Sequence, residues 1–330
     1  MWRIIIAIAS AIAVAIAGLM FYANSSVNKT LNINESTLYT VEAGVSYNHL
    51  LSDFKKRGFI DSRLAYRVHA KLNPKQVALK AGTFEFVPNM SMAELLLLIQ
   101  SGVEHQFKIT FVEGTTFKEW LIQLAETDHI QQTLADKTPL QIVQLIDSEA
   151  KHPEGLFFPD TYLFTVGTSD IDILRKAYKR MDKELQQSWQ NKAQGLPYKN
   201  AYEALIMASL IEKETGQLKE QPLIAAVFIN RLAKKMRLQT DPTIIYGLGD
   251  RYTGDITYAN IREKTAYNTY KINGLTPTPI AMPGKSAIEA ALHPVKSDYL
   301  YFVSKGNGEH YFSKTLREHN NAVNKYIRGK

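Results

Sequence analysis

The sequence contains no cysteine among its 330 residues. This absence excludes a disulfide framework, metal sites built on thiolates, cysteine nucleophiles and a lipid anchor on an N-terminal cysteine. It permits an oxidising compartment without proving one. Glycine (18) and proline (12) are not enriched, and 45% of the residues are hydrophobic while 22% are charged. These values are typical of an ordinary globular protein and exclude disorder, collagen-like repeats and a coiled coil for most of the chain.

Several motifs of well-known chemistry are also missing. The eight histidines show no HExxH pattern and no paired spacing, so the sequence predicts no metal site. No GxGxxG and no GxxxxGK[ST] segment is present, and this leaves a nucleotide cofactor without support. GxSxG is absent too, which disfavours a serine esterase or peptidase. Carboxylate chemistry without a cofactor is what remains.

Acidic residues are fewer than basic ones, with 32 Asp and Glu against 39 Lys and Arg, and the formal charge is +7. Such an excess could suit nucleic acid, anionic lipid or an acidic polymer. The basic residues occur in short groups such as Lys55-Lys56-Arg57 and Lys234-Lys235, and no run of five or more exists. We therefore expect no nucleic-acid partner.

One long hydrophobic run stands at the N-terminus. Ile4 to Ala23 are twenty residues without a charge, long enough to cross a bilayer as a helix. A cleaved signal peptide is the alternative, although its small-residue pattern (Ala13-Val14-Ala15) lies inside the run. We favour an uncleaved anchor over residues 1–23. Arg3 on the short side then places residues 24–330 across the membrane, outside the cytoplasm.

Beyond the anchor the pattern predicts an α+β protein. Residues 24–38 are polar and are expected to form a tether, residues 39–103 form a small strand-helix-helix-strand-helix unit, and residues 104–330 form a larger mixed α/β domain. The expected strands are 38–41, 82–87, 107–112 and 299–303, and the expected helices are 47–57, 63–72, 92–100, 117–125, 141–148, 171–189, 202–215, 222–235 and 286–291.

The helix expected at 202–215 carries the first candidate site. Ala204 to Ile211 are apolar on every side apart from Ser209, so this helix should be buried all round. It ends in Glu212-Lys213-Glu214, where the helix dipole, burial and a second carboxylate all favour a protonated glutamic acid. Such a group can act as a general acid. Alternatively, these charges only mark where the helix emerges into water.

Two polar clusters follow this helix. Gln239, Thr240 and Asp241 stand in the first, and Asp241 precedes a proline, which biases its backbone to an extended form and its side chain to a loop or strand edge. Asn268 and Tyr270 belong to the second, which is dense in aromatic rings. Aromatic faces mixed with amide and hydroxyl groups suit a saccharide groove, and a structural loop with aromatic packing is the alternative.

Four ordered blocks together resemble the endolytic murein transglycosylases, the MltG or YceG-like family. The blocks are Met207 to Thr215, Val227 to Leu232, Arg237 to Thr243 and Ala266 to Tyr270, with support from Glu154 to Tyr162, His293-Pro294 and Tyr301 to Val303. The resemblance covers essentially the whole chain. The segment Thr276 to Pro279 departs from the family's usual loop sequence.

The resemblance implies a single-pass inner-membrane protein with a LysM-like subdomain at residues 39–103 and a periplasmic catalytic domain. It implies cleavage of the β-1,4 bond between MurNAc and GlcNAc inside peptidoglycan strands, leaving 1,6-anhydro-MurNAc ends. One glutamate serves first as acid and then as base: Glu214, with Glu212 as the fallback. Gln239, Thr240, Asp241, Asn268 and Tyr270 would bind the glycan. The family also implies association with penicillin-binding synthases.

Two other functions remain open. In the first, the protein is a muramidase-type hydrolase in which Asp241 is a second carboxylate that positions water. In the second, it is a non-catalytic peptidoglycan-binding scaffold. The first predicts reducing ends on the products, and the second predicts binding without cleavage.

Overall fold

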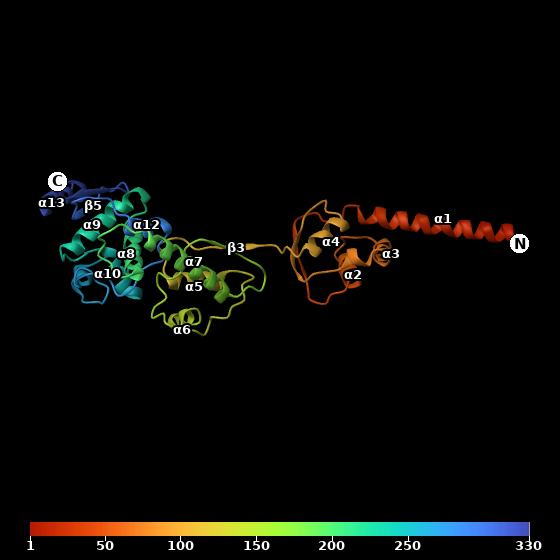
Figure 1. The fold of residues 1–330 in the computed structure, drawn as a ribbon, viewed down its shortest axis with the longest axis horizontal. Helices are drawn as coiled ribbons and strands as arrows, with labels where there is room; N and C mark the ends of the chain where they lie inside the picture. Colours follow the sequence, from red (N-terminus) through yellow and green to blue (C-terminus); the bar gives the residue numbers. More distant parts are fainter. Residues whose placement is uncertain (330) are drawn as a thin grey trace. The chain divides into compact units, whose positions relative to one another are not determined.

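The structure is a computed structural model that describes residues 1–329, and its elements mix helices with short strands (Figure 1). It confirms the α+β class. Strands pair only two by two within the described residues: β1 with β2, β3 with β4 and β5 with β6. The strands are β1 Thr37–Val41, β2 Gly82–Phe86, β3 Phe107–Thr110, β4 Thr161–Phe164, β5 Tyr301–Ser304 and β6 His310–Ser313.

Most of the regular secondary structure is helical. The α-helices are α1 Trp2–Val27, α2 Tyr47–Lys56, α3 Leu64–Leu72, α4 Met92–Ser101, α5 Phe117–Glu126, α6 Pro139–Gln144, α7 Asp170–Gln190, α8 Ala201–Glu214, α9 Gln221–Ala233, α10 Asp241–Leu248, α11 Tyr258–Arg262, α12 Lys285–Leu292 and α13 Leu316–Tyr326. Short 3-10 turns lie at Pro74–Val77, Leu218–Glu220 and Gly249–Arg251.

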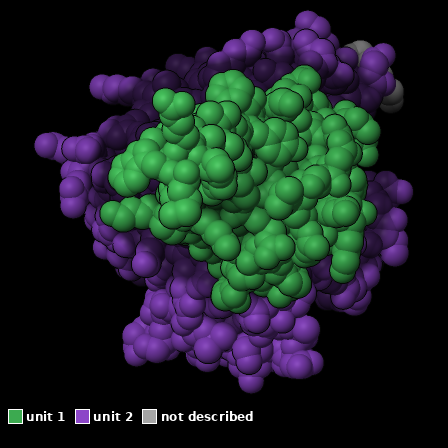
Figure 2. Space-filling view, turned by 90° about the vertical axis from the view of Figure 1, so that its right-hand side faces the viewer, with its two compact units in different colours: residues 1–107, 163–166 green, residues 108–162, 167–330 purple. Residues whose placement is uncertain are grey.

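The chain forms two compact units, coloured separately in Figure 2. Unit 1 contains residues 1–107 and 163–166, and unit 2 contains 108–162 and the chain from Gly167 onward. The chain leaves unit 1 within β3 and re-enters it briefly within β4. Each unit has its own cluster of buried apolar side chains, as two independently packed cores require.

Unit 1 is built around one antiparallel strand pair. Thr37 of β1 lies opposite Phe86 of β2, and Val41 lies opposite Gly82. Strands with this alternation bury one face, and Phe84 and Phe86 are fully buried. Helix α4 is fixed by a capping box in which Ser91 and Glu94 bond each other's backbone N–H, and it ends at Gly102 in the left-handed conformation (φ 71°).

The N-terminal helix α1 is long and apolar. It covers 26 residues with a mean hydropathy of 2.7 over its most apolar window, which is enough to cross a membrane by length and composition. It runs to Val27, beyond the expected anchor. The segment expected as a polar tether also differs, because Leu31 and Ile33 are buried in the unit 1 core. Two apolar residues in an otherwise polar segment are too short a pattern to predict burial.

Helix α8 is the centre of unit 2. Every residue from Ala204 to Ile211 is buried, which confirms the helix predicted to be buried all round. It packs on α7, α9, α10 and α12. The single polar residue, Ser209, is satisfied twice: its hydroxyl donates to the Ile206 carbonyl (2.7 Å) and accepts from the Ile280 amide (3.0 Å).

Five elements were not expected from the sequence: β4, β6, α10, α11 and α13. Helix α13 has only one buried residue, Ala322, and the capping box of Thr315 and Glu318 at its start was the local sign that was missed. Helix α10 corrects the expectation for Asp241. Thr240 is the extended residue, whereas Asp241 begins the helix and Pro242 occupies its first turn, where a missing N–H costs nothing.

Candidate active site

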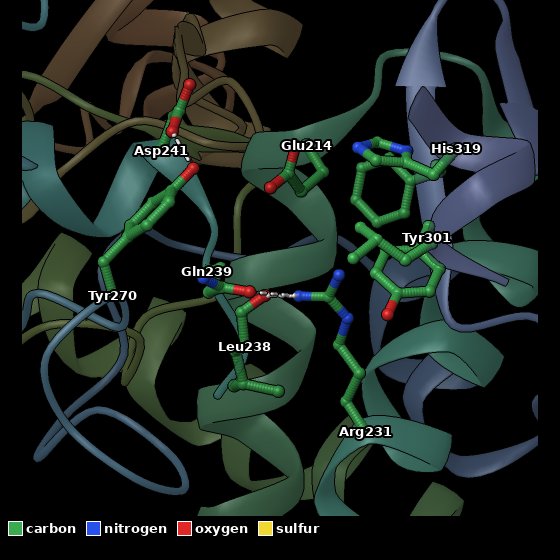
Figure 3. A pocket seen from close by; sticks show the side chains of 10 residues that line it. Glu214, Arg231, Leu238, Gln239, Asp241, Tyr270, Tyr301 and His319 are labelled. Atoms are coloured by element: carbon green, nitrogen blue, oxygen red, sulfur yellow. Dashed lines mark hydrogen bonds between the residues drawn. The ribbon is translucent and has the colours of Figure 1, made fainter. Parts of the chain in front are cut away.

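A pocket of about 350 Å³ opens at the C-terminal end of α8 in unit 2 (Figure 3). The residues around it come from the end of α8, from the stretch between the end of α9 and the start of α10, from the loop after α11, from β5 and from α13. They are Glu214, Arg231, Leu238, Gln239, Asp241, Tyr270, Tyr301, Phe302, Leu316 and His319. Five separate segments of the chain therefore meet around the last residue of the buried helix.

Glu214 is half-buried, and its carboxylate accepts a hydrogen bond from the Thr240 hydroxyl. Burial raises the pKa of Glu214 to about 7, and the negative charge of Asp241 acts in the same direction. The Thr240 hydroxyl and the Arg231 charge oppose this rise in pKa. The neighbouring carboxylate is therefore Asp241, and not Glu212 as the sequence suggested. Near neutral pH this group can both donate and accept a proton.

Glu212 faces a different part of unit 2. Its carboxylate accepts the Gly284 amide (2.9 Å), and it does not line the pocket. Burial is the main cause that raises its pKa, followed by the charge of Glu113. By exposed surface Glu212 and Glu214 are alike, both half-buried. What separates them is the surroundings: Glu212 ties the turn before α12 to α8, and Glu214 meets the pocket.

Three buried threonines fix the loop that faces Glu214. The Thr240 amide donates to the Thr269 hydroxyl (3.0 Å), and the Thr243 hydroxyl bonds both the Thr240 carbonyl (2.6 Å) and the Thr269 hydroxyl (2.8 Å). All three side chains are at most 1% exposed. Buried polar groups that are fully paired are rigid, so this cluster holds the Thr240 hydroxyl on the glutamate.

Gln239 adopts an unusual backbone conformation next to Thr240. Its φ of 52° lies in the left-handed region, which costs a non-glycine residue about 1 kcal/mol or more. Two hydrogen bonds stabilise this conformation: the backbone amide of Gln239 donates to the Thr269 carbonyl (3.3 Å), and its side-chain oxygen accepts from Arg231 (3.4 Å). The exposed Gln239 side chain lines the pocket, and its amide nitrogen can donate hydrogen bonds.

Asp241 and Tyr270 form one wall of the pocket (Figure 3). The Tyr270 hydroxyl donates to the Asp241 carboxylate (2.6 Å), and Asp241 is exposed. The carboxylate of Asp241 is thus already engaged by a phenol. The ring of Tyr270 remains available to pack against an apolar face of a ligand.

Asn268 does not reach the pocket. It is 1% exposed, and its side-chain amide donates to the carbonyls of Glu263 (2.7 Å), Asn260 (3.2 Å) and Ile261 (3.2 Å). Its side-chain oxygen accepts the Tyr270 amide (3.0 Å). Every polar atom of this side chain is therefore used inside the protein. Asn268 orients the loop that carries Tyr270 and has no free group for a ligand.

Comparison with known proteins decides the family. Residues 39–325 match the YceG-like family. The chain belongs to this family. It is 34% identical to the endolytic murein transglycosylase of Bacillus subtilis over 318 residues, covering 91% of this chain and 86% of that protein. It is 28% identical to the endolytic murein transglycosylase of Streptococcus pneumoniae, covering 88% of this chain and 58% of the longer streptococcal protein.

A crystal structure from the YceG-like family shows a related fold. The yceG-like protein of Listeria monocytogenes superposes with a TM-score of 0.54 at 31% sequence identity, covering 87% of this chain and 99% of that one. The agreement extends over nearly all of the Listeria chain. The α+β fold around a buried helix is thus one that a YceG-like protein adopts in a crystal.

The second wall of the pocket was not predicted as a site. Arg231, Tyr301 and His319 lie across Glu214 from Asp241 and Tyr270 in Figure 3. Arg231 and Tyr301 stand inside sequence blocks that resemble the YceG-like family, and that position was the only signal for them. His319 had none, because α13 was not expected. Its ring stacks on Tyr301 with centroids 5.2 Å apart.

The loop that departs from the usual YceG-like sequence lies outside the pocket. The Thr278 hydroxyl bonds the Tyr267 hydroxyl (2.9 Å), and the Thr276 hydroxyl donates to the Thr278 carbonyl (2.7 Å). Neither threonine contributes to the pocket wall. The departure therefore leaves the pocket wall around Glu214 intact.

Glu154 is a second carboxyl with a strongly raised pKa. Burial raises its pKa to about 7, while hydrogen bonds from the Phe117 amide (2.9 Å) and the Tyr246 hydroxyl (3.0 Å) oppose this. It is 4% exposed and lies outside the pocket. Glu154 therefore links α5 to α10 as a structural group. Across residues 1–329, no three His, Asp or Glu side chains approach closely enough to hold a metal ion.

Proposed function

We propose that this chain is an endolytic murein transglycosylase that cleaves the MurNAc–GlcNAc β-1,4 bond within peptidoglycan strands and leaves 1,6-anhydro-MurNAc ends. The observation that carries the proposal is the Glu214 carboxyl, half-buried in a pocket with a pKa of about 7. Three curated relatives carry this name, and the 34% identity to the Bacillus protein extends over 91% of this chain.

In the first half of the reaction, protonated Glu214 donates its proton to the glycosidic oxygen. The bond between C1 of MurNAc and that oxygen breaks, and GlcNAc leaves with a free 4-hydroxyl. Glu214 becomes a carboxylate at this moment. The Thr240 hydroxyl and the nearby positive charge of Arg231 stabilise that carboxylate, which both groups favour over the neutral acid.

In the second half, the 6-hydroxyl of the same MurNAc attacks C1, and Glu214 takes its proton. A C1–O6 bond forms, and the glutamic acid is restored in its starting state. Atoms and charges balance without water and without a second carboxylate. One residue with a pKa near the working pH suits both roles, because a general acid–base group is most effective there.

The two aromatic walls would hold the sugar between them. Tyr270 and Tyr301 are half-buried rings on opposite sides of Glu214 (Figure 3), and pyranose rings have apolar faces that pack on aromatic side chains. The exposed amide of Gln239 is placed to bond hydroxyl or acetamido groups. Thr240 and Asn268, which the family resemblance suggested as binding residues, contribute instead by holding Glu214 and the Tyr270 loop.

The test is the chemistry of the product ends. Purified protein incubated with glycan strands is expected to release fragments whose terminal MurNAc is one water lighter by mass spectrometry than a reducing end, at internal positions of the strand. Exclusively reducing ends would exclude the transglycosylase mechanism. Glycan binding with no fragment release would support a scaffold instead.

A hydrolase with Asp241 as a second carboxylate is the alternative enzyme, and Asp241→Asn separates the two. A hydrolase would lose nearly all activity because its water-activating base is gone, by about 10²-fold or more. We expect the variant to keep making anhydro ends, with the alkaline limit of its pH profile moved to lower pH. The sign follows from Asp241, whose charge raises the pKa of Glu214 in the wild type.

Thr240→Val should move the same pH limit in the opposite direction. Removing the hydroxyl takes away a hydrogen bond that favours the ionised form of Glu214, so the pKa of Glu214 rises above about 7. A hydrogen bond to a charged group contributes about 1.5–3 kcal/mol, which corresponds to about 1–2 pH units. The measurement is kcat/KM against pH. Thr276→Val removes a buried hydroxyl that bonds the Thr278 carbonyl outside the pocket and is the control. An equal shift in both variants would contradict this assignment.

The remaining parts of the proposal concern location and partners. Unit 1 has the strand-helix-helix-strand order expected for residues 39–103, and we propose that this region is a LysM-like glycan-binding subdomain. α1 would anchor the chain in the inner membrane with the catalytic residues 104–330 in the periplasm, where peptidoglycan lies. Penicillin-binding synthases, which produce nascent strands, are the proposed protein partners.

A further inference from the structure

The positive charge of the chain is concentrated in one short segment of unit 1. From Lys55 to Lys80 there are eight Lys and Arg and a single Asp, an excess of seven. The formal charge of the whole chain is also +7, so the other residues sum to zero. Asp53, just before this segment, is paired with Arg57 (2.8 Å). The segment includes helix α3, and its charge has no role in the proposed catalysis.

Helix α3 has a buried inner face and an exposed outer face that is not purely polar. Its inner face is buried through Ala65, Tyr66 and His69. Its outer face mixes bases with large apolar side chains, where Leu64 is 61% and Leu72 is 45% exposed. The bases Arg63, Arg67 and Lys71 follow at intervals of four, which places them in one stripe of a helix.

The basic side chains of this face are not neutralised by the protein. Arg67, Lys71 and Lys75 are exposed, and within residues 1–329 no carboxylate lies within 4 Å of them. Leu97 of α4, which is 67% exposed, adds a further apolar side chain near the same end of α1. Exposed leucines among unpaired bases are the composition of a helix that lies in a membrane surface.

The position of α3 on α1 supplies the second argument. Helix α3 packs against α1, whose Ala23, Ser26 and Val27 are buried there. At 1.5 Å per residue, Ile4 to Ala23 span about 30 Å, the thickness of the hydrocarbon core. Trp2 and Tyr22 stand near the two ends of this run, 78% and 49% exposed, where aromatic side chains favour the membrane interface.

We propose that the α3 face, defined as Leu64, Arg67, Lys71, Leu72 and Lys75, lies on the outer surface of the membrane and binds anionic phospholipid headgroups. Because Ala23 is placed at the edge of the hydrocarbon core, α3 falls at headgroup depth. The bases attract phosphate groups, and the leucines enter the boundary between headgroups and chains. Figure 2 views unit 1 from the side on which α1 begins, the side that would face the bilayer.

This inference rests on the proposed anchoring of α1, and the experiment separates the two. Because the chain has no cysteine, a single introduced cysteine gives one labelled position in the full-length protein. Spin labels at Leu72→Cys on the α3 face, Ile12→Cys in α1 and Tyr258→Cys in unit 2 are compared in nanodiscs of phosphatidylcholine with or without phosphatidylglycerol. Accessibility to an aqueous nickel complex is the readout.

The label at position 12 should be protected in both lipids, and the label at 258 should be accessible in both. The label at 72 should become protected when phosphatidylglycerol is present. In that lipid, Arg67→Glu with Lys71→Glu should restore its accessibility. The matched control is Lys179→Glu with Lys183→Glu, an exposed pair at the same spacing on α7. Each basic residue near an anionic surface contributes about a fivefold factor in binding.

Two results would overturn the proposal. If position 72 stays as accessible as position 258 in anionic nanodiscs while position 12 is protected, the anchor stands and the docking of α3 is wrong. If both charge-reversed pairs change the accessibility of the label at position 72 equally, the change is caused by the net charge of the protein and not by the α3 face. If the label at position 12 were accessible to the nickel complex, both the membrane anchor and the docking of α3 would be excluded. The proposed enzymatic activity would stand apart from this result, because glycan cleavage is measured in detergent.

Discussion

Glu214→Gln is expected to abolish glycan cleavage while leaving the fold intact. An amide cannot donate a proton to the leaving oxygen or accept one from the 6-hydroxyl, and general acid–base groups contribute about 10²–10⁴-fold. Because one residue performs both steps here, we expect a loss of at least about 10³-fold in kcat. The side-chain oxygen of glutamine can still accept the Thr240 hydroxyl, so the melting temperature should not fall.

Glu212→Gln is the matched control for this prediction. The two residues are on the same turn of α8, both are half-buried, and both have raised pKa values. Glu212 bonds the Gly284 amide outside the pocket, so its variant should retain nearly full activity. If Glu212→Gln were the inactive variant and Glu214→Gln the active one, the catalytic role would pass to Glu212.

Arg231→Leu is expected to have the largest effect on stability. Arg231 is 8% exposed, and its guanidinium donates to the carbonyls of Leu300 (2.6 Å), Leu238 (2.8 Å) and Arg237 (3.2 Å). Leucine leaves these carbonyls without donors, and each unsatisfied buried group costs about 1–3 kcal/mol. We expect the free energy of unfolding of unit 2 to fall by about 3–5 kcal/mol, measured by urea denaturation.

Arg237→Leu provides the comparison at a nearby exposed arginine. Its side chain donates to the Tyr270 carbonyl (3.0 Å) at the surface, where water can replace the lost donor. The free energy of unfolding should change by less than about 1 kcal/mol. Equal losses in the two variants would mean that burial of Arg231 does not determine its contribution.

Arg231 has two roles, one in the stability of unit 2 and one in the electrostatics of the pocket. It connects β5 and the α9–α10 connection, and it also lies beside the pocket, where its charge favours the ionised form of Glu214. At the sequence level it was only one member of an Asn-Arg-Leu block. Its role depends on the Leu300 carbonyl, about seventy residues further along the chain, and no local pattern reports such a contact.

For the predicted glycan-binding residues too, the sequence shows the residue type, and only the fold shows where each side chain lies. The sequence was sufficient to nominate Gln239, Asp241 and Tyr270, and all three line the pocket. The sequence also nominated Asn268, because the sequence alone does not distinguish a buried asparagine from an exposed one. Only the fold shows that all polar atoms of Asn268 are used by the carbonyls around it and by the Tyr270 amide.

The sequence by itself determined the apolar run of α1, the buried helix α8 and the presence of two carboxylates at its end. These follow from local composition and periodicity, which act over one or two helical turns. The tertiary structure decided which carboxylate faces the pocket. Residues two positions apart on a helix point about 200° apart, so Glu212 and Glu214 face opposite sides. Which side becomes a pocket depends on where α10, β5 and α13 pack, and those contacts join segments far apart in the chain.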